Sequence, residues 1–201
     1  MADAFDPQHA GRLEDPARLA ALPQAAVVSL LRLEGDETVI DYGAGTGVYT
    51  VAVAEAVPNG RVIAVEALAR LAEMLRAKLT PKLADRLELV ETDANSVPAP
   101  DEMADRIVMV DVLHHLYDQP EALSEVNRLL RPGGLFVVVD WGDRERPVGP
   151  PLEHVLGLAA VREVIASMGL EELEAHEPGS LLPYHLAVVA EKSRHLPPAH
   201  L

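Results

Sequence analysis

The chain contains no cysteine, which excludes disulfide bonds and every metal site built from thiolates. Aromatic residues are also scarce, at 3% of the 201 residues, so alanine, leucine and valine must fill the interior. The apolar share of 49% suits one well-filled core. We expect residues 1–201 to form a single domain, with residues 1–15 as a loose N-terminal arm or lid and residues 193–201 as a flexible tail.

Basic residues are few and scattered. The chain has 17 lysines and arginines against 32 aspartates and glutamates, which gives a formal net charge of −15. Binding to nucleic acid requires clustered positive charge opposite the phosphates. The charge balance therefore argues against a nucleic-acid partner and leaves a small molecule or a basic partner open.

Long apolar runs are missing as well. Because the chain has no window of 18 uninterrupted apolar residues, the sequence predicts no transmembrane helix. The first residues, MADAFD, lack the basic and apolar regions of a secretory signal peptide. We therefore expect a cytoplasmic protein with no membrane partner.

The most informative stretch that is present runs from Val39 to Gly47, with the sequence VIDYGAGTG. A β-branched, apolar lead-in ends at Asp41, three glycines then alternate, and a helix-compatible run begins at Val48. This pattern is typical of a buried strand that turns sharply into a helix and leaves its backbone exposed at the turn. Glycines at alternate positions let a ligand approach the main chain without meeting a Cβ atom.

The glycine spacing distinguishes between two candidate nucleotide-like ligands. A dinucleotide such as NAD prefers G-x-G-x-x-G, with its pyrophosphate at the helix N-terminus. Here the third glycine, Gly47, comes one residue early, and Asp41 is a poor neighbour for a pyrophosphate. A ligand with a positive charge and no phosphate suits the turn better, and S-adenosylmethionine (SAM) is such a ligand. An NAD-dependent oxidoreductase stays as the less favoured alternative.

The run VIDYGAGTG resembles the first motif of the class I SAM-dependent methyltransferases, hhDhGhGxG, in which h is an apolar residue. The segment Leu130–Gly134, LRPGG, is similar to the hLkPGG turn of the same family. The resemblance covers residues 24–192 and extends to the small single-domain methyltransferases of quinone biosynthesis. The arm at 1–15 is shorter than the helical lids that shape a quinone pocket, which argues against a bulky quinone acceptor.

The resemblance implies a function. SAM would be the cofactor, S-adenosylhomocysteine its product, and the reaction an in-line displacement that methylates a small molecule. The sulfonium is already an activated donor, so a base is needed only if the acceptor must lose a proton. A non-catalytic SAM-binding domain, acting as a sensor or assembly partner, is the alternative that fits the same cofactor residues.

Beyond the glycine turn, strand and helix patterns alternate along the chain. Apolar strands that alternate with helices predict an α/β fold with a doubly wound, mostly parallel sheet. The resemblance implies a Rossmann-like, seven-stranded sheet with an antiparallel last strand. We expect strands at 39–42, 61–65, 87–90, 106–110, 135–140, 170–176 and 184–190, helices at 16–33 with a break at Pro23, 47–57, 68–79 and 119–130, and a further helix within 152–168.

Ligands in such sheets bind beyond the carboxyl ends of the strands, so each strand end is a candidate for chemistry. The first strand brings the acid and glycines of the turn, and the resemblance places their backbone along the methionine part of SAM. A tight turn without a ligand is the alternative interpretation. The cofactor residues expected here are Asp41, Gly43, Gly45 and Gly47.

The second and third strands end in acids that suit a nucleoside. Glu66 can accept two hydrogen bonds from a ribose diol, beside Ala67, although a solvated loop acid would look the same. Leu68 can supply an apolar wall for the adenine ring. The resemblance implies that Asp93 faces the adenine amino group and that Ala94 packs beside the ring; the alternative is that Asp93 caps a turn.

The fourth strand is followed by the sequence DVLHHL, which resembles a segment found in many small-molecule methyltransferases. Asp111 is expected to contact the cofactor. His114 and His115 are candidate catalytic bases, because histidine titrates near neutral pH. The alternative is a structural role, in which the histidine pair orients the loop beside the cofactor.

The loop after the fifth strand holds two candidates for a substrate pocket. Trp141 can form an aromatic wall, with ordinary loop packing as the alternative, and His154 can face either the pocket or solvent. The spacing of the histidines matches no metal-ligand motif, so we expect no metal. The histidines considered are His9, His114, His115, His154 and His185.

Overall fold

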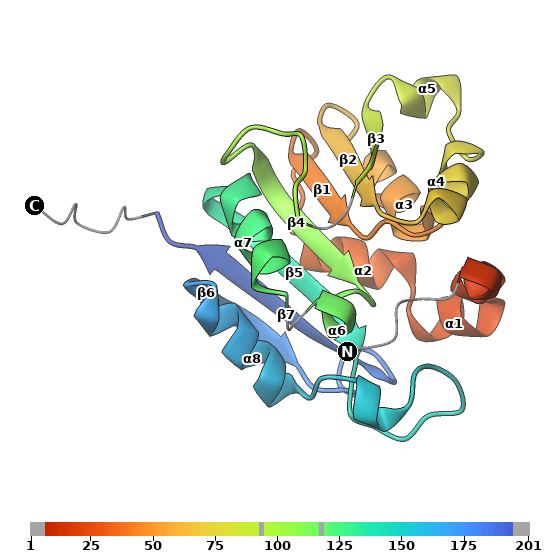
Figure 1. Cartoon of the computed structure of the whole chain (residues 1–201), viewed down its shortest axis with the longest axis vertical. Helices are drawn as coiled ribbons and strands as arrows, with labels where there is room; N and C mark the ends of the chain where they lie inside the picture. The colour runs from red at the N-terminus through yellow and green to blue at the C-terminus, as the bar shows by residue number, and fades with distance from the viewer. Residues whose placement is uncertain (1–6, 93–94, 117–118, 195–201) are drawn as a thin grey trace, which may run out of the picture.

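The computed structural model describes residues 7–92, 95–116 and 119–194. Within these ranges seven strands form one sheet in the order β3-β2-β1-β4-β5-β7-β6, flanked by helices (Figure 1). The strands are β1 (Thr38–Tyr42), β2 (Arg61–Glu66), β3 (Leu87–Glu91), β4 (Ala104–Val110), β5 (Leu130–Trp141), β6 (Leu170–His176) and β7 (His185–Lys192).

The strand directions confirm the predicted sheet. Strands β1 to β5 pair with one another in parallel. The last strand, β7, lies between β5 and β6 and is antiparallel to both. The fold is therefore the expected doubly wound, Rossmann-like arrangement with one strand reversed.

Helices and short 3₁₀ segments connect the strands, and none in the described ranges is long and apolar enough to cross a membrane. The predicted break at Pro23 is confirmed, because it separates α1 from α2. The elements are η1 (Pro7–Glu14), α1 (Pro16–Ala21), α2 (Gln24–Leu30), α3 (Val48–Ala56), α4 (Ala69–Arg76), α5 (Pro81–Ala84), α6 (Leu113–Leu116), α7 (Pro120–Leu129), η2 (Leu152–His154) and α8 (Leu158–Ser167).

Residues 7–14, expected as part of an arm or lid, form η1. Helix α8 lies within the range 152–168 that was expected to hold a helix, and η2 precedes it. One local prediction was wrong. The turn expected at Arg131–Gly134 lies inside β5, where Leu130 already pairs with Ala104 and a register shift precedes the pairing of Leu135 with Arg106. The extra residues are therefore taken up as a bulge rather than as a turn before the strand.

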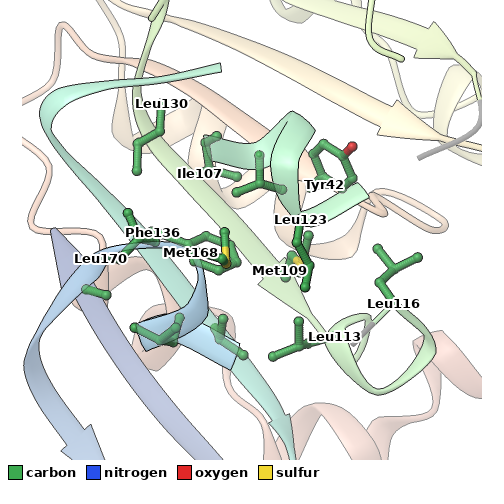
Figure 2. Packing of buried hydrophobic residues seen from close by; sticks show 14 of the residues in the cluster. Tyr42, Ile107, Met109, Leu113, Leu116, Leu123, Leu130, Phe136, Met168 and Leu170 are labelled. Atoms are coloured by element: carbon green, nitrogen blue, oxygen red, sulfur yellow. The ribbon is translucent and has the colours of Figure 1, made fainter. Parts of the chain in front are cut away.

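Strand β4 shows why the core has two halves. Successive side chains of a strand point to opposite faces of the sheet. Ile107 and Met109 lie in the hydrophobic cluster that also holds residues of α7 and α8, whereas Val108 and Val110 lie in the cluster with residues of α2 and α3. Figure 2 shows the first cluster. Burial on both faces holds the carboxyl end of β4 in a fixed place.

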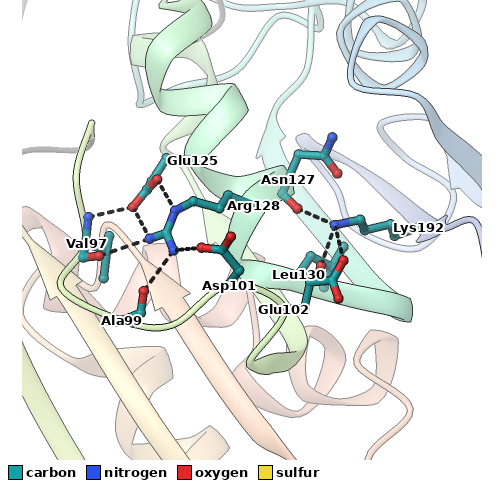
Figure 3. A network of polar contacts seen from close by, with 9 residues as sticks. All are labelled: Val97, Ala99, Asp101, Glu102, Glu125, Asn127, Arg128, Leu130 and Lys192. Carbon is teal, nitrogen blue, oxygen red and sulfur yellow. Dashed lines mark hydrogen bonds and ion pairs between the residues drawn. The ribbon is translucent and has the colours of Figure 1, made fainter. Parts of the chain in front are cut away.

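Arg128 of α7 holds the loop that precedes β4 by hydrogen bonds and ion pairs (Figure 3). Its guanidinium donates to both carboxylate oxygens of Glu125, at 2.7 and 2.8 Å, and to Asp101 at 2.6 Å. It also donates to the carbonyl oxygens of Ala99 and Val97, at 2.8 and 3.1 Å. One fork-shaped side chain thus satisfies two carboxylates and two carbonyls.

Replacing Arg128 with lysine should lower the free energy of unfolding by about 1–3 kcal/mol, because lysine keeps the charge but cannot reproduce the planar fork. Urea denaturation measures the change. Arg70→Lys, an exposed position on α4, is the matched control and should leave stability nearly unchanged. Equal stability of the two variants would contradict a structural role for the fork.

Candidate functional site

The carboxyl ends of β2, β1 and β4 lie side by side and border a cavity of about 300 Å³. This volume is at the lower end of the range for small-molecule pockets. Three lining residues that the sequence did not suggest are Leu13, Arg18 and Tyr49. The residues named from the sequence that line it are Asp41, Gly43, Gly45, Glu66, Ala67, Leu68, Asp111 and His115.

The three glycines of the turn have different roles, although all have positive φ angles, of 83°, 58° and 82° for Gly43, Gly45 and Gly47. A Cβ atom on Gly47 would lie 2.2 Å from a methyl carbon of Leu75, so this glycine lets α3 pack against α4. Gly47 does not line the cavity. A Cβ atom on Gly45 would meet only Leu13, at 3.4 Å, so the backbone is open to the cavity at this position.

Glu66 connects the end of β2 to the glycine turn. One of its carboxylate oxygens accepts a hydrogen bond from the Gly45 amide at 2.7 Å, and the other accepts from the Leu68 amide at 2.8 Å. Burial raises the pKa of this carboxyl above its ordinary value, against the lowering effect of the amides. Each oxygen keeps a lone pair that can accept a hydroxyl of a ribose.

Asp41 is a second buried carboxylate beside the turn. It accepts a hydrogen bond of 2.6 Å from the Thr50 hydroxyl. Burial, with the nearby charge of Glu66, raises its pKa to about 6. Within the described ranges, no lysine or arginine forms an ion pair with Asp41 or Glu66. Two carboxylates without a neutralising cation favour a positively charged ligand.

The N-terminal elements η1 and α1 each contribute a residue to one side of the cavity, Leu13 and Arg18, and the sequence had suggested an arm or lid at residues 1–15. Lys78 donates to Glu14 at 2.6 Å and to the Thr46 carbonyl at 2.7 Å, so it ties η1 to the glycine turn. Arg18 of α1 reaches the cavity and donates to the Leu13 carbonyl at 2.8 Å. Helix α1 begins at a capping aspartate followed by proline, which is a signal readable from the sequence.

Asp111, directly after β4, has a left-handed backbone with φ of 58°. Its Oδ2 accepts a hydrogen bond from Arg18 at 2.7 Å, and its Oδ1 lies 3.2 Å from the Nε2 of His185. Burial alone would raise the pKa of Asp111, but His185 and Arg18 lower it to about 2. Asp111 is therefore a permanent negative charge at this end of the cavity.

His114 does not line the cavity but is buried against Asp140. Its Nδ1 lies 2.6 Å from one oxygen of Asp140, and its backbone amide donates to the other at 2.9 Å. Burial lowers the pKa of His114, but the charge and hydrogen bond of Asp140, together with the charge of Asp111, raise the pKa overall. The pair fixes α6 against the end of β5, so His114 can act on the site only by positioning.

His115, the next residue, does line the cavity. Its ring centroid lies 3.9 Å from that of His114. Burial and the charge of His114 lower its pKa to about 4, so the His115 ring is neutral at pH 7. Such a ring can hold a substrate by hydrogen bonds, but it is a weak proton acceptor.

The remaining residues named from the sequence lie elsewhere. Trp141 is 7% exposed and packs against the His185 ring, with a centroid separation of 4.1 Å, without lining the cavity. His154 is exposed in η2. Asp93 and Ala94 lie outside the described residues. In the part of the chain that the structure describes, no three histidines, aspartates or glutamates gather as metal ligands, and the absence of a metal stays a prediction.

Comparisons with known proteins agree on one family. Residues 40–138 match the family described as a methyltransferase domain. The ubiquinone/menaquinone biosynthesis C-methyltransferase of Hahella chejuensis is 27% identical over 141 residues, 69% of this chain and 56% of that protein. The demethylmenaquinone methyltransferase of Lactiplantibacillus plantarum is 30% identical over 124 residues, 61% of this chain and 52% of that protein. The chain thus spans about half the length of these curated relatives.

A solved structure gives a more complete match. The SAM-dependent methyltransferase from Aquifex aeolicus superimposes with a TM-score of 0.84 at 28% identity, covering 93% of this chain and 98% of that chain. The sheet order defines a Rossmann-like fold, and an open glycine turn with an acid at the end of β2 is typical of nucleotide-binding members of this class. With the matching sequences, they show that the chain belongs to the class I SAM-dependent methyltransferases, the family that the sequence predicted.

The residues of the cavity fit SAM, the cofactor of this family. Asp41 and Glu66 give the cavity negative charge that suits a cationic ligand, and Gly45 leaves the backbone open to the cavity. Asp111 also lines the cavity, with Arg18 at its Oδ2 and His185 at its Oδ1. These features do not suit the pyrophosphate of NAD.

Proposed function

We propose that this protein transfers the methyl group of SAM to a small organic acceptor by in-line displacement. The observation that carries the proposal is the pair of buried carboxylates, Asp41 and Glu66, beside the open backbone of Gly45. When bound, SAM supplies an activated methyl group on a sulfonium. The negative charge of the cavity suits this cation, and the net charge of −15 argues against an anionic polymer as acceptor.

The protein's own part is alignment and exclusion of water. Glu66 would hold the ribose, and the glycine turn would lie along the cofactor chain. Leu13 of η1 lines the cavity, and Lys78, which follows α4, ties η1 to the glycine turn. Holding two reactants in line can supply about 7–11 kcal/mol of the barrier reduction in favourable cases. This contribution needs no covalent catalysis by a side chain.

The two histidines after β4 would divide the remaining tasks. His115 lines the cavity and would contact the acceptor. His114, held by Asp140, would keep His115 in position through α6. Since the pKa of His115 is about 4, it is a weak base at pH 7. The site therefore favours an acceptor whose nucleophilic atom needs little help in losing a proton. The relatives named for quinone biosynthesis make ring compounds the first acceptors to test.

Conversion of SAM to S-adenosylhomocysteine in the presence of a panel of small nucleophiles and ring compounds tests the proposal. We expect acceptor-dependent turnover by the wild-type chain and none by Gly45→Val. Binding of SAM without turnover of any acceptor would favour the non-catalytic sensor. A hydride-transfer signal with NAD would favour the oxidoreductase.

SAM should bind more tightly as the pH rises from 5 to 7.5. Asp41, with a pKa of about 6, ionises in this interval, and its charge attracts the sulfonium. In the free protein the same ionisation is unfavourable, so the contribution of Asp41 to stability falls between its ordinary pKa of 3.8 and about 6. The positive charge of bound SAM would offset the cost of ionising Asp41, and we expect the affinity for SAM to rise up to about tenfold.

Calorimetric titration over this pH range measures the effect, with S-adenosylhomocysteine as the control ligand. This molecule has a neutral thioether but the same amino-acid end, so its affinity should change less than that of SAM. In Asp41→Asn, the affinities for SAM and S-adenosylhomocysteine should change with pH to the same extent. Parallel pH profiles for both ligands in the wild type would show that Asp41 does not sense the sulfonium.

A further inference from the structure

Glu125 and Arg128 of α7 hold the loop of residues 95–103, between β3 and β4, although neither residue lines the cavity (Figure 3). Glu125 is only 8% exposed, and one of its carboxylate oxygens accepts a hydrogen bond from the Val97 amide at 2.7 Å. Arg128 donates to the carbonyl oxygens of Val97 and Ala99. A buried carboxylate and a guanidinium are thus both committed to one loop.

The loop depends on these contacts because its sequence does not allow regular structure. Residues 97–100 read VPAP, and neither proline has an N–H group to donate. Buried backbone carbonyls in such a segment need donors from elsewhere in the chain. The Val97 side chain is 3% exposed and belongs to the hydrophobic cluster of Figure 2. The donors of Arg128 therefore fix the conformation of the loop beside Val97.

Thr92 connects this loop to the cavity. It directly follows β3 and lines the cavity. Its hydroxyl donates to the Ser96 carbonyl at 2.9 Å, one residue before Val97, and its amide donates to the Glu66 carbonyl at 3.2 Å. These contacts form a continuous path from Arg128, through the backbone at Val97 and Ser96, to the cavity wall at Thr92.

The wall at Thr92 lies where the base of a nucleoside would bind. Strand β2 lies between β1 and β3, so Glu66 at its end separates the glycine turn from Thr92. If the ribose is at Glu66 and the rest of the ligand follows the turn, the base must extend toward the end of β3. Leu68 and Leu71, which follow β2, also line the cavity and offer apolar surfaces for the faces of a base.

We propose that Glu125 and Arg128 are positioning residues for the cofactor: from outside the cavity they fix the wall at Thr92, and this wall holds the edge of the nucleobase. The inference rests on the proposed function, because it takes SAM and S-adenosylhomocysteine as the ligands. Loss of Arg128 would free the carbonyls of Val97 and Ala99 and let the loop move. The base would then lose a hydrogen bond, whereas the ribose would keep its contacts at Glu66.

Titration calorimetry with S-adenosylhomocysteine and S-inosylhomocysteine tests this inference. The second ligand carries a carbonyl oxygen in place of the adenine amino group, so the pair of ligands reports on hydrogen bonding at the edge of the base. The proteins are the full-length wild type, Arg128→Met, Arg128→Lys and the control Lys192→Met. Each is measured at a temperature where circular dichroism shows the variant to be fully folded.

Lys192 is a matched control because it forms the neighbouring network of Figure 3. It donates to the carbonyl oxygens of Asn127 and Leu130, at 2.7 and 2.8 Å, and pairs with Glu102 at 3.7 Å. Lys192→Met therefore removes buried contacts of a similar kind beside α7. It leaves the hydrogen bonds that Arg128 donates to the loop in place.

We expect the wild type to prefer S-adenosylhomocysteine by about tenfold or more. Arg128→Met should weaken this ligand about three- to tenfold, the scale of one hydrogen bond, and leave S-inosylhomocysteine within about twofold. Arg128→Lys should lose less, because it keeps the charge opposite Glu125. Lys192→Met should bind both ligands as the wild type does.

The outcomes separate this inference from the proposed function. Equal weakening of both ligands by Arg128→Met would mean that Arg128 only supports the fold, and the same loss in Lys192→Met would have the same meaning. Equal affinity of the wild type for both ligands would show that the wall does not hold the edge of the base. Each of these results overturns the inference and leaves the cofactor assignment intact. If the wild type binds neither ligand, the proposed function itself fails.

Discussion

Gly45→Val abolishes SAM binding while the protein keeps the circular dichroism spectrum of the wild type: this is the largest effect that we expect on the site. Gly45 has φ of 58°, and its missing side chain leaves open space toward the cavity, with only Leu13 near. A valine here would place two methyl groups where the cofactor chain must approach the backbone. It would also disturb the amide that donates to Glu66.

Gly169→Val provides the matched control for this variant. Gly169 follows α8, has φ of 71°, and has no atom within 4 Å of an added Cβ. Both variants carry the backbone strain of a left-handed residue, about 1–2 kcal/mol, so a comparable loss of stability is expected in each. Only Gly45→Val should lose SAM in calorimetric titration. SAM affinity retained in Gly45→Val, or lost equally in Gly169→Val, would contradict the assignment of the turn.

Asp140→Ala should give the largest loss of stability, about 3–5 kcal/mol, because it leaves several buried hydrogen-bond donors without an acceptor. Asp140 is fully buried at the end of β5. It accepts hydrogen bonds from the His114 amide at 2.9 Å and the Trp141 amide at 2.7 Å, and it lies 2.6 Å from the His114 ring. Without it, α6 loses its attachment to the sheet.

Urea denaturation measures this loss against Asp36→Ala, an exposed loop position that should change stability little. His114→Asn is a further comparison, because the side-chain amide of the new asparagine can still donate a hydrogen bond to Asp140. We expect its cost to be well below that of Asp140→Ala. A loss of less than about 1 kcal/mol for Asp140→Ala would show that the buried donors find other partners.

The strands and the cofactor turn were predictable from the sequence because their signals are local. Apolar, β-branched runs such as 61–65 must be buried on both faces of a parallel sheet. Six of the seven strands begin and end within about two residues of their expected bounds, whereas β5 begins five residues early, at Leu130. The glycine turn was predictable because positive φ angles and close approach both require glycine. Glu66 was predictable as a cofactor residue because it lies at the end of the next strand.

The remaining parts of the site depend on contacts between distant residues, which one sequence does not encode locally. Arg18 and Asp111 are 93 residues apart, and His114 and Asp140 are 26 apart. The four-residue helix α6 has no stability of its own, and the tertiary contacts of His114 maintain it. The η1 segment is polar in sequence and predicts only an arm or lid, whereas its anchoring by Lys78 and Arg18 depends on residues outside the segment.

Calorimetric titration of the full chain with SAM, S-adenosylhomocysteine and NAD in parallel tests the central claim most directly. We expect about micromolar binding of the first two ligands and no heat signal with NAD, because the carboxylates of the cavity suit a sulfonium and not a pyrophosphate. Binding of NAD alone, or of none of the three, would contradict the cofactor assignment and the methyl-transfer function built on it.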